Sequence, residues 1–141
     1  MRNLLQTLAI ATIVLCDSPV YVDELEDLVK GTADYYQLKA LDDNKFMNRS
    51  EKQQRLNEIL ARQPQNIQQQ FYQKVQYEES IRKSEEQYKQ RIADQQGVGD
   101  FMRQIISIEN DMSISSAEAE QRENRLKYGN PAAARLLDDL D

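Results

Sequence analysis

The sequence predicts an all-α protein, and three observations lead to this fold class. Apolar residues recur every three or four positions over most of the chain, which is the spacing of one helix face. Glycine and proline are rare, with four and three copies in 141 residues, so few segments are interrupted. Alternating β-branched runs are missing after residue 16, and the hairpin dipeptides Asn-Gly and Asp-Gly do not occur. We therefore expect an extended helical bundle or hairpin of five to seven helices.

The first predicted element is an apolar segment at residues 1–16. Its run from Leu4 to Cys16 is interrupted only by one glutamine and two threonines, and it is shorter than the ~18 residues of a membrane span. Three interpretations stay open, namely a helix buried in a bundle or oligomer, an export signal or lipid anchor, and a tip that enters a membrane or a partner's groove. The candidate contact residues of this segment are Leu4, Leu5, Leu8 and Leu15.

Residues 20–41 are predicted to form a single helix. Ser18 is suited to the N-cap position and Pro19 to the first helical position. The apolar residues that follow at helical spacing are Val22, Leu25, Val29, Ala33, Tyr36 and Ala40. Gly31 lies inside this stripe as a mild local weakness.

The next helix is predicted to begin at a capping box. The tetrapeptide Ser-Glu-Lys-Gln, which begins at Ser50, has the spacing at which two side chains satisfy the first free amides of a helix. Leu56, Ile59 and Leu60 form the expected buried face. Pro64 is predicted to end or kink this helix, because proline lacks an amide hydrogen and clashes with the preceding turn.

Residues 65–96 are predicted to form one long central helix, because they contain no glycine or proline. The sparse apolar residues of this stretch are Ile67, Phe71, Ile81, Tyr88 and Ile92. In a heptad frame, Lys74, Glu78 and Glu85 occupy the same seam, which disfavours a free-standing two-stranded coiled coil. We expect a helix laid against other helices or forming one surface of an oligomer, with Phe71, Ile81, Tyr88 and Ile92 as candidate interaction residues. The alternative is partial disorder in isolation, because residues 53–96 are rich in glutamine.

Two further helices and a short tail helix are predicted after Gly97, which suits a helix C-terminus. Asp100 can cap the first of them, whose apolar face comprises Phe101, Met102, Ile105, Ile106 and Met112. Phe101 and Ile105 complete the set of candidate interaction residues. A second capping box begins at Ser115, and its helix is expected to end near Gly129.

The chain is thus divided into three predicted parts. Residues 1–16 form the apolar segment, residues 17–129 a helical domain, and residues 130–141 an acidic C-terminal tail helix that begins at Asn130-Pro131. The tail carries acids where the helix dipole disfavours them, so we expect it to fray or to dock on basic groups.

The composition excludes several kinds of active site. The chain has no histidine and one cysteine, which removes histidine-based nucleophile pairs, histidine metal ligands and an internal disulfide. Neither Gly-rich phosphate-binding motif occurs. Glu78 and Glu85 lie two helical turns apart and are the remaining candidates for a divalent cation, although solvated acids explain them better. We expect no enzyme activity, cofactor, metal or small-molecule substrate.

Charge is segregated along a chain of net charge −6. Acids outnumber bases in residues 17–43 and 100–141, whereas bases outnumber acids in residues 44–75. Segments of opposite sign can dock on each other or on another copy, but solvated helix faces without a specific partner explain the pattern better. Nucleic acid is disfavoured as a partner, because the chain as a whole repels phosphate.

These features lead to two hypotheses about function. In the first, the protein is a non-enzymatic structural or interaction subunit of a larger assembly, such as a virion component or a secretion or envelope complex, and contacts copies of itself or other subunits through its helices. The second is an exported or membrane-anchored helical spacer, chaperone or lysis protein that uses residues 1–16 as a signal or anchor and contacts the membrane through residues 4–16. Both hypotheses place the protein in a virion or cell envelope rather than in plain cytosol.

Overall fold

The computed structural model describes residues 18–141, and the named secondary-structure elements of this range are all α-helices. The prediction of an all-α fold is confirmed for this part of the chain. The apolar segment at residues 1–16, with its four candidate leucines, lies outside the described residues. The helices of the described part are α1 (Val22–Leu28), α2 (Ala33–Asp43), α3 (Arg49–Ala61), α4 (Gln65–Gln95), α5 (Gly99–Glu109), α6 (Ser116–Gly129) and α7 (Pro131–Leu140).

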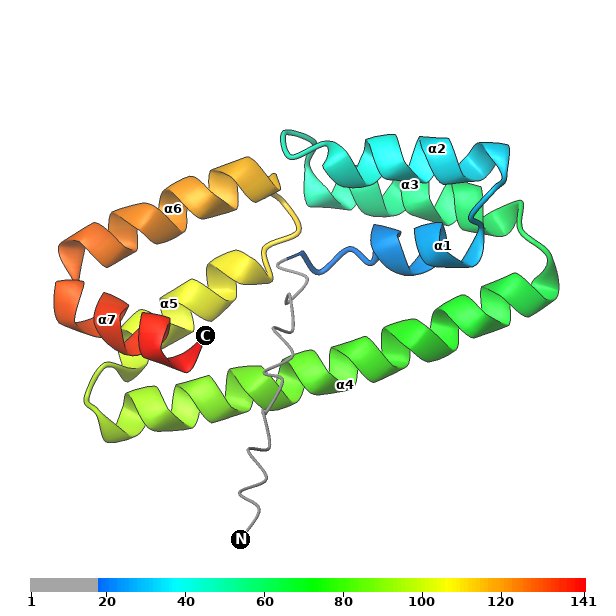
Figure 1. Ribbon diagram of the computed structural model, residues 1–141. Helices are drawn as coiled ribbons and strands as arrows, with labels where there is room; N and C mark the ends of the chain where they lie inside the picture. Colours follow the sequence, from blue (N-terminus) through cyan, green and yellow to red (C-terminus); the bar gives the residue numbers. More distant parts are fainter. Residues whose placement is uncertain (1–17) are drawn as a thin grey trace, which may run out of the picture.

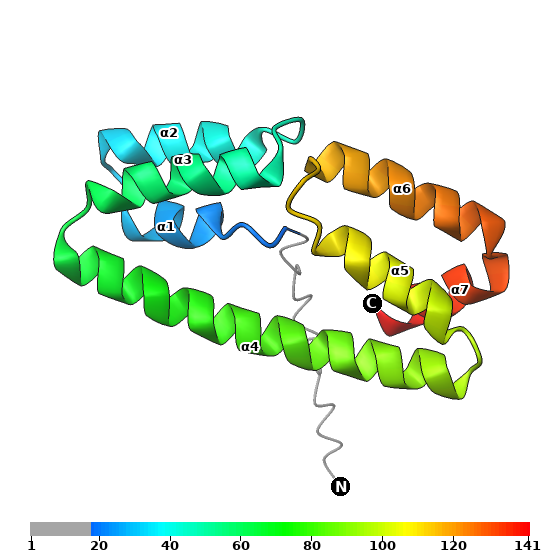
Figure 2. The same ribbon diagram turned by 180° about the vertical axis from the view of Figure 1, so that it is seen from behind.

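Two groups of short helices lie along the long helix α4 (Figure 1). The first lobe consists of α1, α2 and α3 with the first half of α4, and the second lobe consists of α5, α6 and α7 with the second half of α4. The view from behind shows the same division, with α4 running beneath both lobes (Figure 2). Each lobe has its own hydrophobic core cluster, and Met112, from the turn between α5 and α6, also packs against the cluster of the first lobe.

The first lobe holds the larger of the two cores. Its helices contribute mainly Val, Leu and Ile side chains, and Phe71 reaches the cluster from α4. The buried members are Val20, Tyr21, Val22, Leu25, Val29, Leu38, Leu41, Leu56, Ile59, Leu60 and Phe71. The predicted buried face of α3, Leu56 with Ile59 and Leu60, is therefore confirmed.

The predicted single helix over residues 20–41 is wrong, because the chain turns between α1 and α2. Gly31 has a φ of +82°, a left-handed conformation that ends a right-handed helix and that only glycine adopts without strain. The turn lets α1 and α2 pack against each other and shifts the buried face of α2 to Leu38 and Leu41. Tyr36 and Ala40, which belonged to the predicted stripe, are exposed.

The start of α3 also differs from the prediction. The N-cap is Asn48, whose side-chain oxygen accepts a hydrogen bond from the Ser50 amide at 2.9 Å. The Ser50 hydroxyl instead donates to the Met112 carbonyl, 2.7 Å away. Ser50 is thus used for a contact between distant segments, and the capping box predicted there does not form. Pro64 separates α3 from α4, as predicted, and serves as the N-cap residue of α4.

α4 is a single helix of 31 residues, close to the predicted bounds of residues 65–96. Only Phe71 and Ala93 of α4 are buried, one in each lobe. Gly97 ends the helix with a φ of +77°, and the Val98 amide donates to the Ala93 carbonyl at 2.9 Å. This is the glycine C-terminus predicted from sequence. The next helix begins at Gly99 with Val98 as its N-cap, so Asp100 is not the cap expected.

The second lobe has a smaller core, formed by Ala93, Phe101, Met102, Ile105, Ala133 and Leu137. The second capping box is confirmed in part, because the Ser115 hydroxyl accepts from the Glu118 amide at 3.1 Å. The C-terminal helix α7 docks on this lobe and buries Ala133 and Leu137. Its acidic end contacts basic residues of the chain, with Asp141 near Lys89.

None of the helices in residues 18–141 combines the length and the apolar character that crossing a bilayer requires.

Candidate interaction surfaces

Three of the predicted interaction residues are buried in the hydrophobic cores of the protein itself. Phe71 is 4% exposed in the core of the first lobe, and Phe101 and Ile105 are buried in the core of the second. These side chains lie where an amphipathic helix packs against its own neighbours. The three remaining candidates of the described region, Ile81, Tyr88 and Ile92, lie on α4 and are partly exposed.

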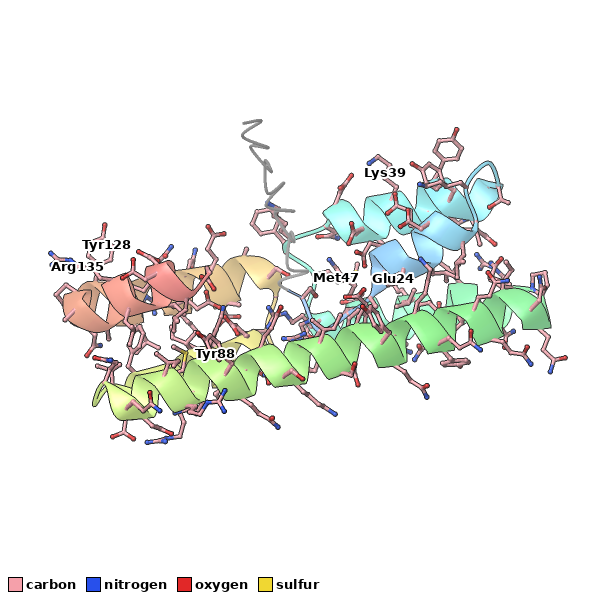
Figure 3. The ribbon with its side chains drawn as sticks, turned by 60° about the horizontal axis from the view of Figure 1, so that its bottom comes forward. Glu24, Lys39, Met47, Tyr88, Tyr128 and Arg135 are labelled. Atoms are coloured by element: carbon pink, nitrogen blue, oxygen red, sulfur yellow. The ribbon has the colours of Figure 1, made fainter. Side chains whose placement is uncertain are left out.

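These three residues belong to a strip along one flank of α4, which we call the α4 strip. It comprises Tyr77, Ile81, Ser84, Tyr88 and Ile92, spaced three or four residues apart so that they share one side of the helix. Tyr77 is 65% exposed and Tyr88 48% exposed. Figure 3 places Tyr88 on the half of α4 that carries the second lobe. Four of its five members are Tyr or Ile side chains that are partly exposed.

Small side chains give the α4 strip a shallow hollow. Ser80, Ile81, Ser84, Glu85 and Tyr88 line a depression of about 320 Å³. The hydroxyls of Ser80 and Ser84 donate to carbonyls of their own helix at 2.7 and 3.0 Å, so neither proton projects as a free donor. A partner helix can approach a helix closely where the side chains are small, and the flanking aromatic and Ile side chains then supply apolar contact.

A second surface lies between α5 and α6. This groove has a volume of about 390 Å³ and is lined by Gln104, Ser107, Ile108, Arg122, Arg125 and Leu126. The Arg122 guanidinium lies 2.8 Å from Glu118 and 3.9 Å from Asp111, so it is already paired within the chain. One of the two arginines that line the groove is therefore already occupied by acidic side chains of the chain itself, which leaves less positive charge for a ligand.

The two lobes meet directly where the turn between α5 and α6 lies against the start of α3. We call this contact the lobe junction and define it as residues 45–50 with residues 108–117. Three backbone amides donate across it: Arg49 to Ile114 at 3.1 Å, Ser50 to Met112 at 2.9 Å, and Ala117 to Lys45 at 3.0 Å. The Asn48 side-chain amide adds a bond of 2.6 Å to the Ser113 carbonyl.

Arg49 lies at the centre of the lobe junction and is only 2% exposed. Its Nη1 atom donates to the carbonyls of Ile108 and Asp111 at 3.0 and 3.1 Å, at and just after the C-terminal end of α5, where the carbonyls of the last turn lack partners in the continuing helix. Burial, followed by the repulsion of Arg82, lowers the pKa of Arg49. Arg49 Nε has no hydrogen-bond partner among the described residues, so this buried cation is incompletely satisfied.

Glu109, in the last turn of α5, is the most perturbed acid among the described residues. Burial, reinforced by the negative charge of Glu123, raises the pKa of Glu109 to about 7, and Lys89 and Arg82 only partly oppose this. The Arg82 guanidinium is directed to the Glu109 backbone carbonyl at 3.2 Å. Residue 109 thus contributes a half-buried carboxyl group with a raised pKa to the segment 108–117.

Candidate metal ligands do not gather anywhere in residues 18–141. No group of three or more His, Cys, Asp or Glu residues there has a geometry that could hold a metal ion. Glu78 and Glu85 are partly exposed on α4.

Sequence reasoning missed the lobe junction, although it found most of the α4 strip. Arg49 was counted only as one basic residue of a solvated segment, because nothing local in the sequence indicates a partner some 60 positions away. Tyr77 and Ser84 were missed because the heptad frame was fixed on Phe71, which in fact faces the core. A frame centred on Ile81, with Ser84 as a small contact residue, would have found the strip.

Comparisons with known proteins give no match: no family model, curated protein or solved structure is similar to this chain.

Proposed function

We propose that the protein is a non-enzymatic structural or interaction subunit of a larger assembly and that it binds its neighbours through helix–helix contacts. The observation that carries this proposal is the α4 strip, which leaves tyrosine and isoleucine side chains partly exposed along a helix of 31 residues. A partner helix placed on this flank would bury the side chains that the two lobes leave uncovered.

The arrangement of α4 supports the same proposal. Each lobe buries one residue of this helix, at Phe71 and Ala93, whereas no residue between them is buried. A helix this long is ordinarily stabilised by an amphipathic face packed against other elements. The middle of α4 is therefore where an additional helix, from a second copy or a different subunit, has most to add.

The test is photo-crosslinking in the cells that naturally make the protein. A photoreactive amino acid in place of Tyr88 is expected to give adducts of defined mass, which mass spectrometry then identifies. The matched control places the same group at Gln76, which is exposed on α4 outside the strip. Adducts from position 88 and not from position 76 would support the proposal.

A substitution pair tests the same surface by a second route. Ile81→Glu with Tyr88→Glu places two charges on the strip with residues of good helix propensity, and sedimentation of the full chain is expected to shift to a smaller species. Gln76→Glu with Gln87→Glu adds the same charge at exposed positions outside the strip and should leave the assembly intact. A monomeric parent chain without position-88 adducts would contradict the proposal. Recovery of the chain in membranes, dependent on residues 1–16, would instead favour the exported or anchored alternative.

A further inference from the structure

The sequence of the apolar segment at residues 1–16 predicts a helix face made of leucines. Leu4, Leu8 and Leu15 follow one another at intervals of four and seven residues, and Ala11 lies at helical spacing between the last two. In a helix these four residues share one side. This is the anchor spacing with which an amphipathic helix binds an apolar surface of a partner element.

The α4 strip continues the flank of α4 against which α1 packs. Helix α1 contacts α4, and the Glu24 carboxylate of α1 lies 3.2 Å from the Lys74 ammonium group of α4. Ile81 and Tyr88 follow Lys74 at intervals of seven residues, so all three lie on nearly the same side of the helix. Figure 3 shows Glu24 near α4 and Tyr88 farther along the same helix.

The chain enters α1 from the side on which the strip lies. Helix α1 runs opposite in direction to α4, and residues 18–21 lie at the level of the middle of α4 (Figures 1 and 2). Val20 and Tyr21 are buried in the core of the first lobe, which fixes the point where the preceding segment begins. A segment that continues away from α1 in the same direction passes along the second half of α4, where most of the strip lies.

The length of the apolar segment matches that of the strip. A helix over residues 4–15 would be about 18 Å long, and the strip from Tyr77 to Ile92 extends about 22 Å along α4. The connection to the buried Val20 consists of residues 16–19, which span at most about 14 Å. Because this connection is short, it favours a docking site on the same chain over one on another copy.

We propose that residues 4–15 bind the α4 strip of their own chain as a helix, with Leu4, Leu8 and Leu15 directed to the strip. Burial of this leucine face and of the Tyr and Ile side chains of the strip drives the contact. The inference rests on the proposed function, because it concerns the regulation of the same surface: a partner helix reaches the strip only when it displaces the segment. The segment is a competitor at high effective concentration and lowers the apparent affinity of the partner.

Hydroxyl-radical labelling of the full isolated chain measures whether the strip is covered. Tyr77 and Tyr88 report on the strip, and mass spectrometry gives their labelling rates. Tyr36 of α2 and Tyr128 of α6 are 71% and 90% exposed and serve as internal references. In the parent chain the two strip tyrosines should be labelled several-fold more slowly than the references.

A pair of substitutions tests whether the leucine face causes this protection. Leu8→Glu with Leu15→Glu should raise the labelling rates of the two strip tyrosines several-fold and leave those of the references unchanged. The matched control is Ala9→Glu with Ile13→Glu, which adds the same charge on the opposite side of the same predicted helix. The control should keep the labelling pattern of the parent chain.

Disulfide trapping separates binding within one chain from binding between copies. Cys16 is the single cysteine of the sequence, so Ser84→Cys creates one possible pair between the segment and the strip. Mild oxidation should form a disulfide within one chain, which runs as a monomer in non-reducing electrophoresis. Leu8→Glu with Leu15→Glu should abolish this disulfide. In the control Gln76→Cys, at an exposed position of α4 outside the strip, the thiols should stay reduced.

Three results would overturn the proposal. The first is equal labelling of the strip tyrosines in the parent chain and in the leucine pair variant. The second is a rise of the same size in the control pair, because the leucine face would then not be the cause. The third is a disulfide that joins two chains, which would make a second copy the occupant of the strip.

These outcomes are distinguishable from failure of the proposed function. The labelling and the disulfide are measured on the isolated chain, whereas the proposed function is tested by adducts from position 88 in cells. A crosslink from position 88 to residues 4–15 of the same chain leaves the mass of the chain unchanged and is not counted as an adduct. Adducts without protection in the isolated chain would overturn the inference alone, and protection without adducts would overturn the proposed function alone.

Discussion

Both lobes pack short helices against α4, but they bury different amounts of apolar side chain. The first lobe buries large side chains from every one of its helices, including Leu25, Leu38 and Leu56, each 0% exposed. The second lobe has a smaller cluster in which two of the six buried residues, Ala93 and Ala133, are alanines. Because burial of a large aliphatic side chain stabilises by about 1.5–3 kcal/mol and alanine contributes much less, the second lobe should be the weaker unit.

Ion pairs add to the second lobe where its apolar core is thin. Lys89 pairs with Asp141, and Lys127 lies 3.9 Å from Asp138, so two bases hold the acidic end of α7. Such partly exposed pairs are worth only about 0–1 kcal/mol each. Because α7 is held by a small core and a few ion pairs, we expect its attachment to weaken under changes of salt or sequence that leave the first lobe unchanged.

The largest expected effect comes from truncating one core leucine in each lobe. Leu25→Ala in the first lobe should lower the free energy of unfolding by about 3–4 kcal/mol, because it removes buried methyl groups and leaves a cavity. Leu137→Ala in the second lobe should cost about 2 kcal/mol, because α7 can withdraw from the core. Urea unfolding with hydrogen exchange resolved by lobe measures both. Equal losses, or loss of both lobes together in each variant, would contradict the difference between them.

The next effect is the pH dependence of stability caused by Glu109. Burial raises its pKa to about 7, so the free energy of unfolding should fall by about 2 kcal/mol between pH 5.5 and 8.5. Glu109→Gln should remove this dependence, and Glu120→Gln should retain it. Urea titrations at four pH values across this range provide the measurement, and a parent chain equally stable at all four would rule the effect out.

A smaller effect is expected at the two glycine turns. Gly31→Ala and Gly97→Ala each place a side chain at positive φ, +82° and +77°, with no atom within 4 Å of the new Cβ. Backbone strain alone should therefore cost about 1 kcal/mol at each site. Gly129→Ala also enters open space, but without a positive φ, and serves as the control. Hydrogen exchange should assign the loss to the first lobe for Gly31 and to the second for Gly97. A loss at Gly129 of the same size would exclude strain as the cause.

Local signals predicted the helices well and their ends less well. The sequence signals that were read correctly are local, because each lies within a few residues of the helix or helix end that it predicts. They are the helical spacing of apolar residues, Pro64, Gly97 and the Ser115 cap. The turn at Gly31 was missed because an unbroken apolar stripe outweighed a single glycine. Only the packing of α1 against α2 decides between a long helix and a hairpin, and that contact is not visible in a local pattern.

The sequence predicted the candidate surfaces only in part, again because local patterns do not show tertiary contacts. Periodicity identifies an apolar position but not which neighbour covers it, so Phe71 and Tyr88 looked alike in sequence although they are 4% and 48% exposed. The lobe junction depends on bonds between residues far apart in the chain, such as Asn48 with Ser113. The raised pKa of Glu109 is likewise a product of tertiary structure, since burial is its main cause.

The smallest expected effect is the response of α7 to salt. Raising NaCl from about 20 mM to about 500 mM should weaken the attachment of α7 by about 0.5 kcal/mol, because Lys89 and Lys127 hold its acidic end. The first lobe offers the matched pair Arg62 and Asp34, 2.8 Å apart. There the neutral Gln63 side-chain amide also donates to Asp34 at 2.7 Å, a bond that salt does not screen. Exchange of α7 amides should therefore accelerate with salt while that of α2 stays constant, and equal acceleration in both helices would show that ion pairing does not distinguish the lobes.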